Sequence, residues 1–478
     1  MKFKVGATTA RAFGRRIGFV PMREDIMANT TDITDASLPT ATVTTPQHKR
    51  RVYGAAAVGT AVEYYDFNIY GTAAALVFSQ VFFAQVDGAL GLVLSFTTLA
   101  VGYAARPIGG ILGGHFGDRI GRKAVLIATM TAMGVSTFGI GILPSSAAIG
   151  SSAAVLLIIL RLIQGLAAGG EYGGAVTLAA EHSERQQRGL MASSASIGVY
   201  LGAFLAWASF AALGFMSDES FEAWGWRLPF LGSIVLVAVG LYVRLRVDET
   251  PHFKALKAAR AEQTPTERRS RRDLPIISVI RDSPKKLLLA TILYTGPSLA
   301  VALTFIFILS YATNELGAPR TLYVNSLMLS MGLGVLIVPL VAALSDRIGR
   351  RWMFIAATIG AGVWSFIIFP LAENGSTWAV LGIFLVGVTL LNSVTLALSS
   401  AILAEAFPTK HRYTGVSVAF QFAGFFGFGL GPLMAALIVA QGWGTLPISS
   451  IVLTVCVASA ICTFALGKTH EEELDKVG

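Results

Sequence analysis

Long apolar segments alternate with short polar loops along nearly the whole chain after residue 50. Most of these segments reach the roughly 20 residues that an α-helix needs to cross the hydrocarbon core of a bilayer. Helices are expected because a spanning segment must satisfy its own backbone hydrogen bonds in lipid. The pattern therefore predicts an all-α integral membrane protein with about twelve transmembrane helices. We place them near residues 54–78, 88–113, 124–143, 153–177, 190–214, 227–247, 287–313, 322–344, 352–372, 378–403, 414–440 and 447–467.

Composition and charge agree with this class. The 478 residues are 54% hydrophobic and only 14% charged, whereas a soluble domain carries about 25% charged residues. Basic residues crowd alternate loops, such as 119–123 and 347–351, while the opposite loops hold acids such as Asp218 and Glu315. This positive-inside bias predicts that both termini are cytoplasmic. The net charge of +9 is thereby explained without a nucleic-acid partner.

The spans divide into two sets of six. We expect an N-terminal six-helix bundle at 51–247 and a C-terminal one at 287–467, related by pseudo-symmetry. The basic, polar stretch 248–286 would link them on the cytoplasmic side, close to anionic lipid head groups. Residues 1–50 are read as a disordered cytoplasmic tail and 468–478 as a short cytoplasmic tail.

An internal repeat supports this division. Asp118 and Asp346 lie in like basic turns 228 residues apart, and Glu181 and Glu405, each followed by an arginine seven residues on, lie 224 apart. Such a repeat predicts a transporter built of two like halves. These charges could pair across the inner face and separate when the halves rock, or they could only set topology. The predicted gating residues are Asp118, Arg119, Arg122, Glu181, Arg188, Asp346, Arg347, Arg350, Glu405 and Arg412.

Ionisable residues inside the spans are costly and therefore candidates for function. Counting about 1.5 Å per residue places Asp66 near the midplane and Arg161 about 6 Å towards the outside. Glu63, Arg106 and Glu171 fall roughly 5–9 Å towards the cytoplasm, at one depth, where they could pair. A structural salt bridge that only holds helices together is the alternative.

The second half lacks ionisable counterparts: the positions equivalent to Arg106 and Arg161 are Gly334 and Leu385. We therefore predict proton coupling in the first half, through Glu63, Asp66 and Glu171. Substrate contacts would come from both halves. The predicted substrate-binding residues are Tyr70, Arg106, Arg161, Gln164, Tyr294, Tyr311, Asn392 and Gln421.

Two stretches resemble a known superfamily. The GDRIGRK turn at 117–123 and the RLIQG stretch at 161–165 are similar to signatures of the major facilitator superfamily. Within it, the chain resembles the metabolite:proton symporter family. The stretches that carry this resemblance are 63–71, 105–110, 169–174, 224–230, 249–253 and 405–413.

The resemblance implies twelve helices in two six-helix bundles and proton-driven uptake across the cell membrane. Known members carry dicarboxylates, citrate, shikimate, or the osmolytes proline and betaine. The run at 71–78 is more similar to shikimate-type members. We therefore expect a secondary active transporter that takes up a small organic metabolite with protons by alternating access. A carboxylate such as shikimate or a dicarboxylate is the expected substrate.

Other functions remain open at this point. They are a proline/glycine betaine:proton symporter, a sugar facilitator and a drug:proton antiporter. An enzyme is not expected, because the sequence has no metal-ligand cluster, no nucleophile–histidine constellation and no phosphate-binding glycine loop. We expect a monomer whose partners are its substrate, protons and the bilayer, without a cofactor or metal.

Overall fold

The computed structural model describes residues 46–120, 122–181, 188–245, 275–407 and 412–466. These residues form helices joined by short turns, and no strand occurs among them. The predicted tails and the linker lie largely outside the described residues. The helices belong to one compact unit, Gln47–Gly478.

Six long helices make up the first half of this unit. They are α1 (Pro46–Leu76), α3 (Gly88–Ile120), α4 (Arg122–Ile142), α6 (Ser152–Glu181), α7 (Arg188–Ala211) and α9 (Arg227–Leu245). Short helices occupy the turns between them, and these are α2 (Phe78–Phe82), α5 (Ser146–Ile149), α8 (Asp218–Ser220) and the π-helical turn η2 (Phe221–Gly225).

The second half also has six spanning segments, three of which contain π-helical turns. The continuous ones are α15 (Arg320–Ile348), α16 (Arg350–Asn374) and α21 (Leu446–Ala465). The interrupted ones are α13 (Pro284–Ala302) with η3 (Leu303–Phe307), α14 (Ile308–Ser310) and η4 (Tyr311–Glu315); α17 (Thr377–Phe384) with η5 (Leu385–Asn392) and α18 (Ser393–Ala406); and α19 (Arg412–Gly424) with η6 (Phe425–Gly429) and α20 (Leu430–Ala440).

The predicted number of spans agrees with this inventory. Among the described residues, nine helices are long and apolar enough to cross a membrane, and the bent segment around η2 and α9 makes ten. The remaining two are α1, which carries Glu63 and Asp66, and α7, whose described apolar part is shorter. The expectation of an all-α membrane protein with twelve spanning helices is confirmed.

Two boundaries differ from those expected. Helix α1 begins at Pro46 rather than near residue 54, because a helix can continue through polar residues beyond the apolar run. The end of the predicted linker contains a further helix, α12 (Pro275–Asp282), and α13 follows it from Pro284. Both begin with proline, which fits the first turn of a helix because its missing N–H is not needed there.

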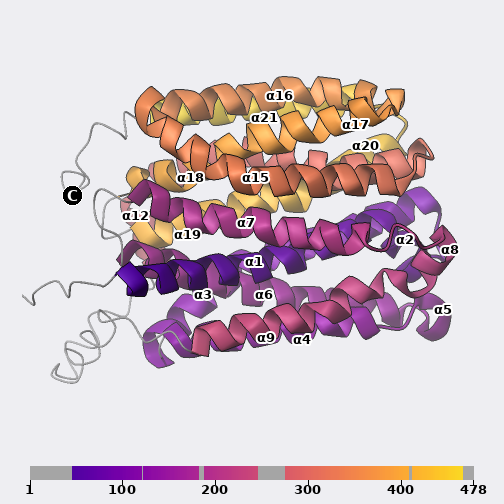
Figure 1. The fold of residues 1–478 in the computed structure, drawn as a ribbon, viewed down its shortest axis with the longest axis horizontal. Coiled ribbons are helices and arrows are strands. Elements are labelled where there is room, and N and C mark those ends of the chain that lie inside the picture. The colour runs from indigo at the N-terminus through magenta and orange to yellow at the C-terminus, as the bar shows by residue number, and fades with distance from the viewer. Residues whose placement is uncertain (1–45, 121, 182–187, 246–274, 408–411, 467–478) are drawn as a thin grey trace, which may run out of the picture. The chain divides into compact units, whose positions relative to one another are not determined.

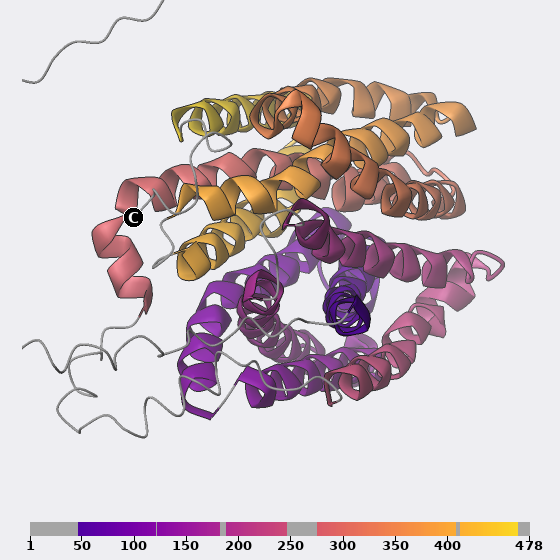
Figure 2. The ribbon, with the colours of Figure 1, turned by 60° about the vertical axis from the view of Figure 1, so that its left-hand side comes forward.

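The helices of each half lie together, and the two halves meet along specific helices. Figure 1 shows the first half in indigo to rose and the second in salmon, orange and yellow. Seen from another side, α1 is surrounded by other helices of the first half (Figure 2). Between the halves, α7 packs along α15, and α3 packs along α19, η6 and α20. Smaller contacts of α7 with α18 and of α6 with α19 also join the halves.

Glycines allow α3 and α6 to pack with their backbones in contact. A Cβ atom at Gly109 would lie 2.0 Å from the carbonyl oxygen of Leu166, and one at Gly169 would lie 1.9 Å from that of Arg106. Small residues permit such close approach between membrane helices. The packing fixes Arg106 of α3 and Arg161 of α6 on neighbouring helices.

Candidate functional site

A cavity lies where the two halves meet. Its lining comes from α1, α3 and α7 of the first half and from α13, η3, α15, η5, α18, α19 and η6 of the second. Aromatic rings dominate it: Tyr294 stacks on Phe420 with centroids 4.9 Å apart, and Tyr103 stacks across the halves on Phe428 at 5.8 Å. Arg106 is the one charged side chain among the lining residues that the structure describes.

Arg106 is held by a carboxylate and by two aromatic faces. It forms an ion pair with Glu63 (3.6 Å), and both side chains are about 95% buried, at 6% and 4% exposed. Its Cζ atom lies 3.5 Å from the ring centroid of Phe67 and 4.5 Å from that of Tyr103. The pairing expected from their common depth is therefore present. A guanidinium group has five N–H donors, so Arg106 retains capacity for an anion in the cavity.

Asp66 begins a second polar cluster that reaches three helices. The hydroxyl of Thr137 on α4 donates to Asp66 Oδ2 (2.9 Å) and accepts from Gln164 Nε2 on α6 (2.9 Å). Arg161 Nη1 in turn donates to Gln164 Oε1 (2.6 Å). All three predicted residues in this chain of contacts, Asp66, Gln164 and Arg161, are fully buried. The cluster thus links a buried carboxylate to a buried cation through neutral groups.

Phe67 lies between this cluster and the cavity. The Cζ atom of Arg161 is 4.6 Å from its ring centroid and 3.9 Å from that of Tyr70, so Phe67 contacts both Arg106 and Arg161. Tyr70 donates to the hydroxyl of Thr98 (2.6 Å). Arg161, Gln164 and Tyr70 do not line the cavity. Their contacts in this structure are with the Asp66 cluster, Thr98 and the Phe67 ring.

The predicted substrate residues of the second half are divided between the cavity and other places. Tyr294 and Asn392 line the cavity. Gln421 is buried nearby on α19 but is not among the lining residues. Tyr311 lies on η4 and its hydroxyl donates to Glu373 (3.3 Å), away from the cavity. The side chain of Glu171 lies outside the described part of the chain.

The comparison with protein families decides the class. The model of the Major Facilitator Superfamily matches residues 56–390 and 298–477. The chain belongs to the major facilitator superfamily. Its fold agrees: the crystal structure of a D-xylose-proton symporter superposes with a TM-score of 0.68 at 19% identity, covering 89% of this chain and 99% of that one.

Relatives of known name confirm the resemblance to metabolite:proton symporters. The shikimate transporter of Escherichia coli (strain K12) is 35% identical over 407 residues, which cover 84% of this chain and 91% of that protein. The proline/betaine transporter of Salmonella typhimurium is 31% identical over 435 residues, covering 89% and 85%. The chain is thus a membrane transporter of metabolites, and the cavity between its halves is the candidate substrate site.

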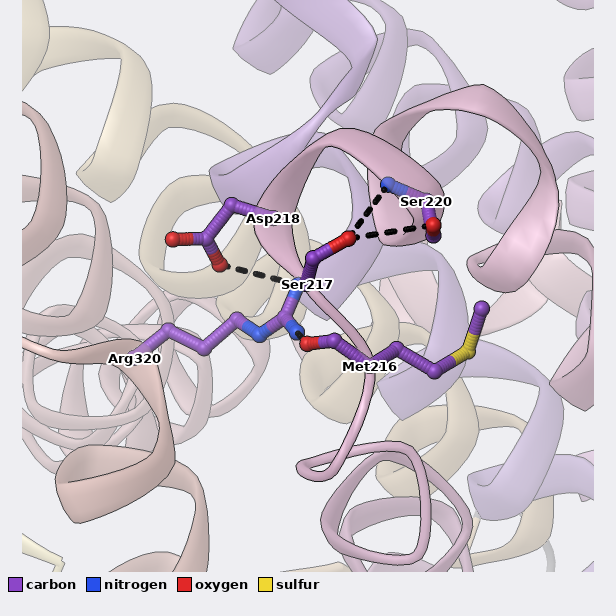
Figure 3. A network of polar contacts seen from close by, with 5 residues as sticks. All are labelled: Met216, Ser217, Asp218, Ser220 and Arg320. Atoms are coloured by element: carbon purple, nitrogen blue, oxygen red, sulfur yellow. Dashed lines mark hydrogen bonds and ion pairs between the residues drawn. The ribbon is translucent and has the colours of Figure 1, made fainter.

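The transporter has a contact between its halves at the end opposite the predicted cytoplasmic loops, which we call the outer contact. Figure 3 shows Arg320 of α15, which pairs with Asp218 at the start of α8 (3.6 Å) and donates to the carbonyl oxygen of Met216 in the loop before it (3.1 Å). Its Cζ atom also lies 3.6 Å from the ring centroid of Phe221. One arginine of the second half therefore joins three residues of the first.

The strengths of these three contacts differ. Asp218 is 85% exposed while Arg320 is only 11% exposed. An exposed ion pair contributes little, so the carbonyl and the ring of Phe221 hold the arginine more than the carboxylate does.

We expect Arg320→Gln to open the outer contact and Asp218→Asn to leave it nearly unchanged. Spin labels at Phe215 and Trp443, both exposed and one in each half, would report the distance between the halves. The two natural cysteines are buried. Arg320→Gln should shift the populations about tenfold towards longer distances, because it removes the charged partner of a carbonyl and a ring. Equal effects of the two variants would show instead that the ion pair dominates.

At the predicted cytoplasmic end, one of the expected ion pairs is described. Arg350 at the start of α16 pairs with Glu405 near the end of α18 (3.0 Å), with both side chains largely buried. Both helices belong to the second half, so in this conformation the pair joins helices within that half. Arg347 is exposed. The side chains of the other gating candidates lie outside the described residues: Asp118, Arg119, Arg122, Glu181, Arg188, Asp346 and Arg412.

Sequence reasoning missed several residues of the site. Thr137 was not singled out because a threonine in a membrane helix often bonds its own backbone, as this one also does with Met133. Phe67 and Tyr103 are aromatic residues in apolar spans and gave no signal apart from their nearness to Asp66 and Arg106. Arg320 did carry a signal, as the clear basic residue among acidic outer loops.

Proposed function

We propose that the chain is a proton-coupled symporter that takes up a small organic acid by alternating access. It works as a monomer in the cell membrane with both termini in the cytoplasm. The observation that carries this proposal is the arrangement of two buried groups around Phe67. A guanidinium group, Arg106, lines the cavity, and a carboxylate, Asp66, lies in the adjoining polar cluster.

The cavity favours a carboxylate with an apolar or ring-shaped body. Arg106 supplies a cation for one carboxylate, and the stacked aromatic rings of the lining suit a flat or cyclic substituent. A second carboxylate would meet no second charged partner among the described lining residues. We therefore place shikimate ahead of a dicarboxylate.

The polar cluster supports coupling to protons. A carboxylate inside a membrane protein is costly when charged, so it is a natural site for a proton to bind and leave. Thr137 holds Asp66, and the contacts through Gln164 lead to Arg161, which also touches the Phe67 ring beside the cavity. Protonation of Asp66 would weaken its hold on this cluster, and the change would reach the cavity wall through Phe67.

A proline/betaine carrier is the second candidate, because a relative bears that name and aromatic rings bind quaternary ammonium groups. The rings in the first half argue against it. Arg106 already lies over Phe67 and Tyr103, so these two faces are occupied by a cation of the protein itself.

Substrate class is tested by exchange in proteoliposomes loaded with one unlabelled solute at a time. Shikimate, 2-oxoglutarate, citrate, proline and betaine are compared. We expect exchange of labelled shikimate, and we expect Arg106→Gln to raise its KM at least tenfold, since a hydrogen bond to a charged group is lost. Arg281→Gln on the exposed surface of α12 is the matched control and should change nothing.

Exchange of proline or betaine alone would identify the second candidate instead. A KM for shikimate that is equal in Arg106→Gln and Arg281→Gln would remove Arg106 from the binding site.

A further inference from the structure

The side chain of Tyr200, in the first half of the transporter, forms hydrogen bonds with the second half. It lies near the middle of α7 in the first half, and its side chain is only 1% exposed. Its hydroxyl donates to the carbonyl oxygen of Val388 (3.0 Å) and accepts from Asn392 Nδ2 and Ser393 Oγ, both at 2.9 Å. All three partners belong to the second half, so the hydrogen-bonding capacity of this hydroxyl is met entirely across the interface.

The ring of Tyr200 packs closely against a glycine of the second half. A Cβ atom at Gly334 of α15 would lie 2.2 Å from Cδ1 and Cε1 of Tyr200, so the ring lies against bare backbone. Val388 and Asn392 lie on the π-helical segment η5, where the regular α-helical bonding pattern is interrupted. Within this segment the carbonyl oxygen of Val388 accepts the hydrogen bond of the phenol.

The contact also borders the cavity. Tyr200 and Asn392 are both lining residues, so a solute in the cavity lies beside the bond that joins α7 to η5. Moving the halves apart at this level would break all three hydrogen bonds of the Tyr200 hydroxyl, to Val388, Asn392 and Ser393. Each of these groups would then need a new partner, because buried polar groups without hydrogen bonds are costly.

We propose that Tyr200 is a positioning residue that fastens the two halves at the level of the cavity, and that its hydroxyl must release Val388, Asn392 and Ser393 for access to alternate. The contact stabilises the conformation seen here and sets the rate at which the transporter leaves it. This inference rests on the alternating access of the proposed function, but it does not depend on which solute is carried or on proton coupling.

The test removes one oxygen atom. Tyr200→Phe keeps the ring against Gly334 and loses only the hydroxyl. Tyr323→Phe is the matched control, because its buried hydroxyl donates to the carbonyl oxygen of Ala372 and both residues lie in the second half. Distances between labels at Phe215 and Trp443 are measured in both variants without any substrate.

We expect Tyr200→Phe to change the ratio of the distance populations at least fivefold away from the present conformation, and Tyr323→Phe to change it less than twofold. Melting temperatures of the two variants should be similar. The rate of shikimate exchange should change in Tyr200→Phe and stay near the wild-type rate in Tyr323→Phe.

A second variant approaches the contact from the other half. Ser393→Ala should shift the populations in the same direction, and the double variant should shift them less than the two single effects combined, because both remove one shared contact. Populations that stay within twofold of wild type in Tyr200→Phe and in Ser393→Ala would overturn the proposal. A shift in populations without any shikimate exchange would leave this proposal standing and contradict only the choice of substrate.

Discussion

Asp66→Asn is expected to abolish accumulation of substrate while leaving exchange intact. Asparagine has the same shape and can still accept the hydrogen bond from Thr137, so the fold should persist. It cannot bind and release a proton, so the solute would no longer be driven by the proton gradient. In proteoliposomes with an inward proton gradient, the ratio of internal to external shikimate should fall to about one, because a carrier without coupling only equilibrates its solute.

The control for this experiment is Asp282→Asn, which removes an exposed carboxylate on α12. It should accumulate shikimate as the wild type does. Full accumulation by Asp66→Asn would show that Asp66 does not couple transport to protons. Glu63 would then be the remaining candidate among the carboxylates whose side chains the structure describes. Loss of exchange as well as accumulation would instead assign Asp66 a role in binding.

Gly169→Ala is expected to destabilise the transporter severely. The new Cβ atom would lie 1.9 Å from the carbonyl oxygen of Arg106, so α3 and α6 would have to move apart along their whole contact. Overpacking of this kind costs about 3 kcal/mol, so the melting temperature should fall below that of the wild type. Thermal unfolding of the purified protein in detergent measures the effect.

Gly232→Ala provides the opposite case on another membrane helix. A Cβ atom at Gly232 of α9 would meet nothing within 4 Å, and alanine is the better helix former. This variant should be as stable as the wild type or slightly more stable. If both variants melt at the wild-type temperature, the close packing of α3 on α6 does not fix the positions of Arg106 and Arg161.

Contacts between side chains could be predicted from the sequence where the depth of each residue in the membrane was sufficient to identify its partner. Counting residues from the ends of apolar runs put Glu63 and Arg106 at one depth, and they are paired.

Prediction was poorer wherever the lateral arrangement of helices decides the contact. Arg350 and Glu405 were among the charges that could pair between the halves, and they pair with each other at the ends of two helices of one half. Charges at helix ends on one membrane face share a depth, so depth alone cannot choose between partners. The contact of Tyr200 with Asn392 could not be predicted for the same reason. It depends on how α7 packs along α15 and on the π-helical form of η5.

The central claim is that a proton gradient drives this transporter to concentrate an organic acid. Its most direct test is the uptake of labelled shikimate by wild-type protein in proteoliposomes, with an inward proton gradient and again after a protonophore. The account predicts accumulation well above the external concentration that collapses when the protonophore is added. Equilibration to the same level with and without the gradient would contradict it, and Glu63 and Asp66 would then be structural charges of a facilitator.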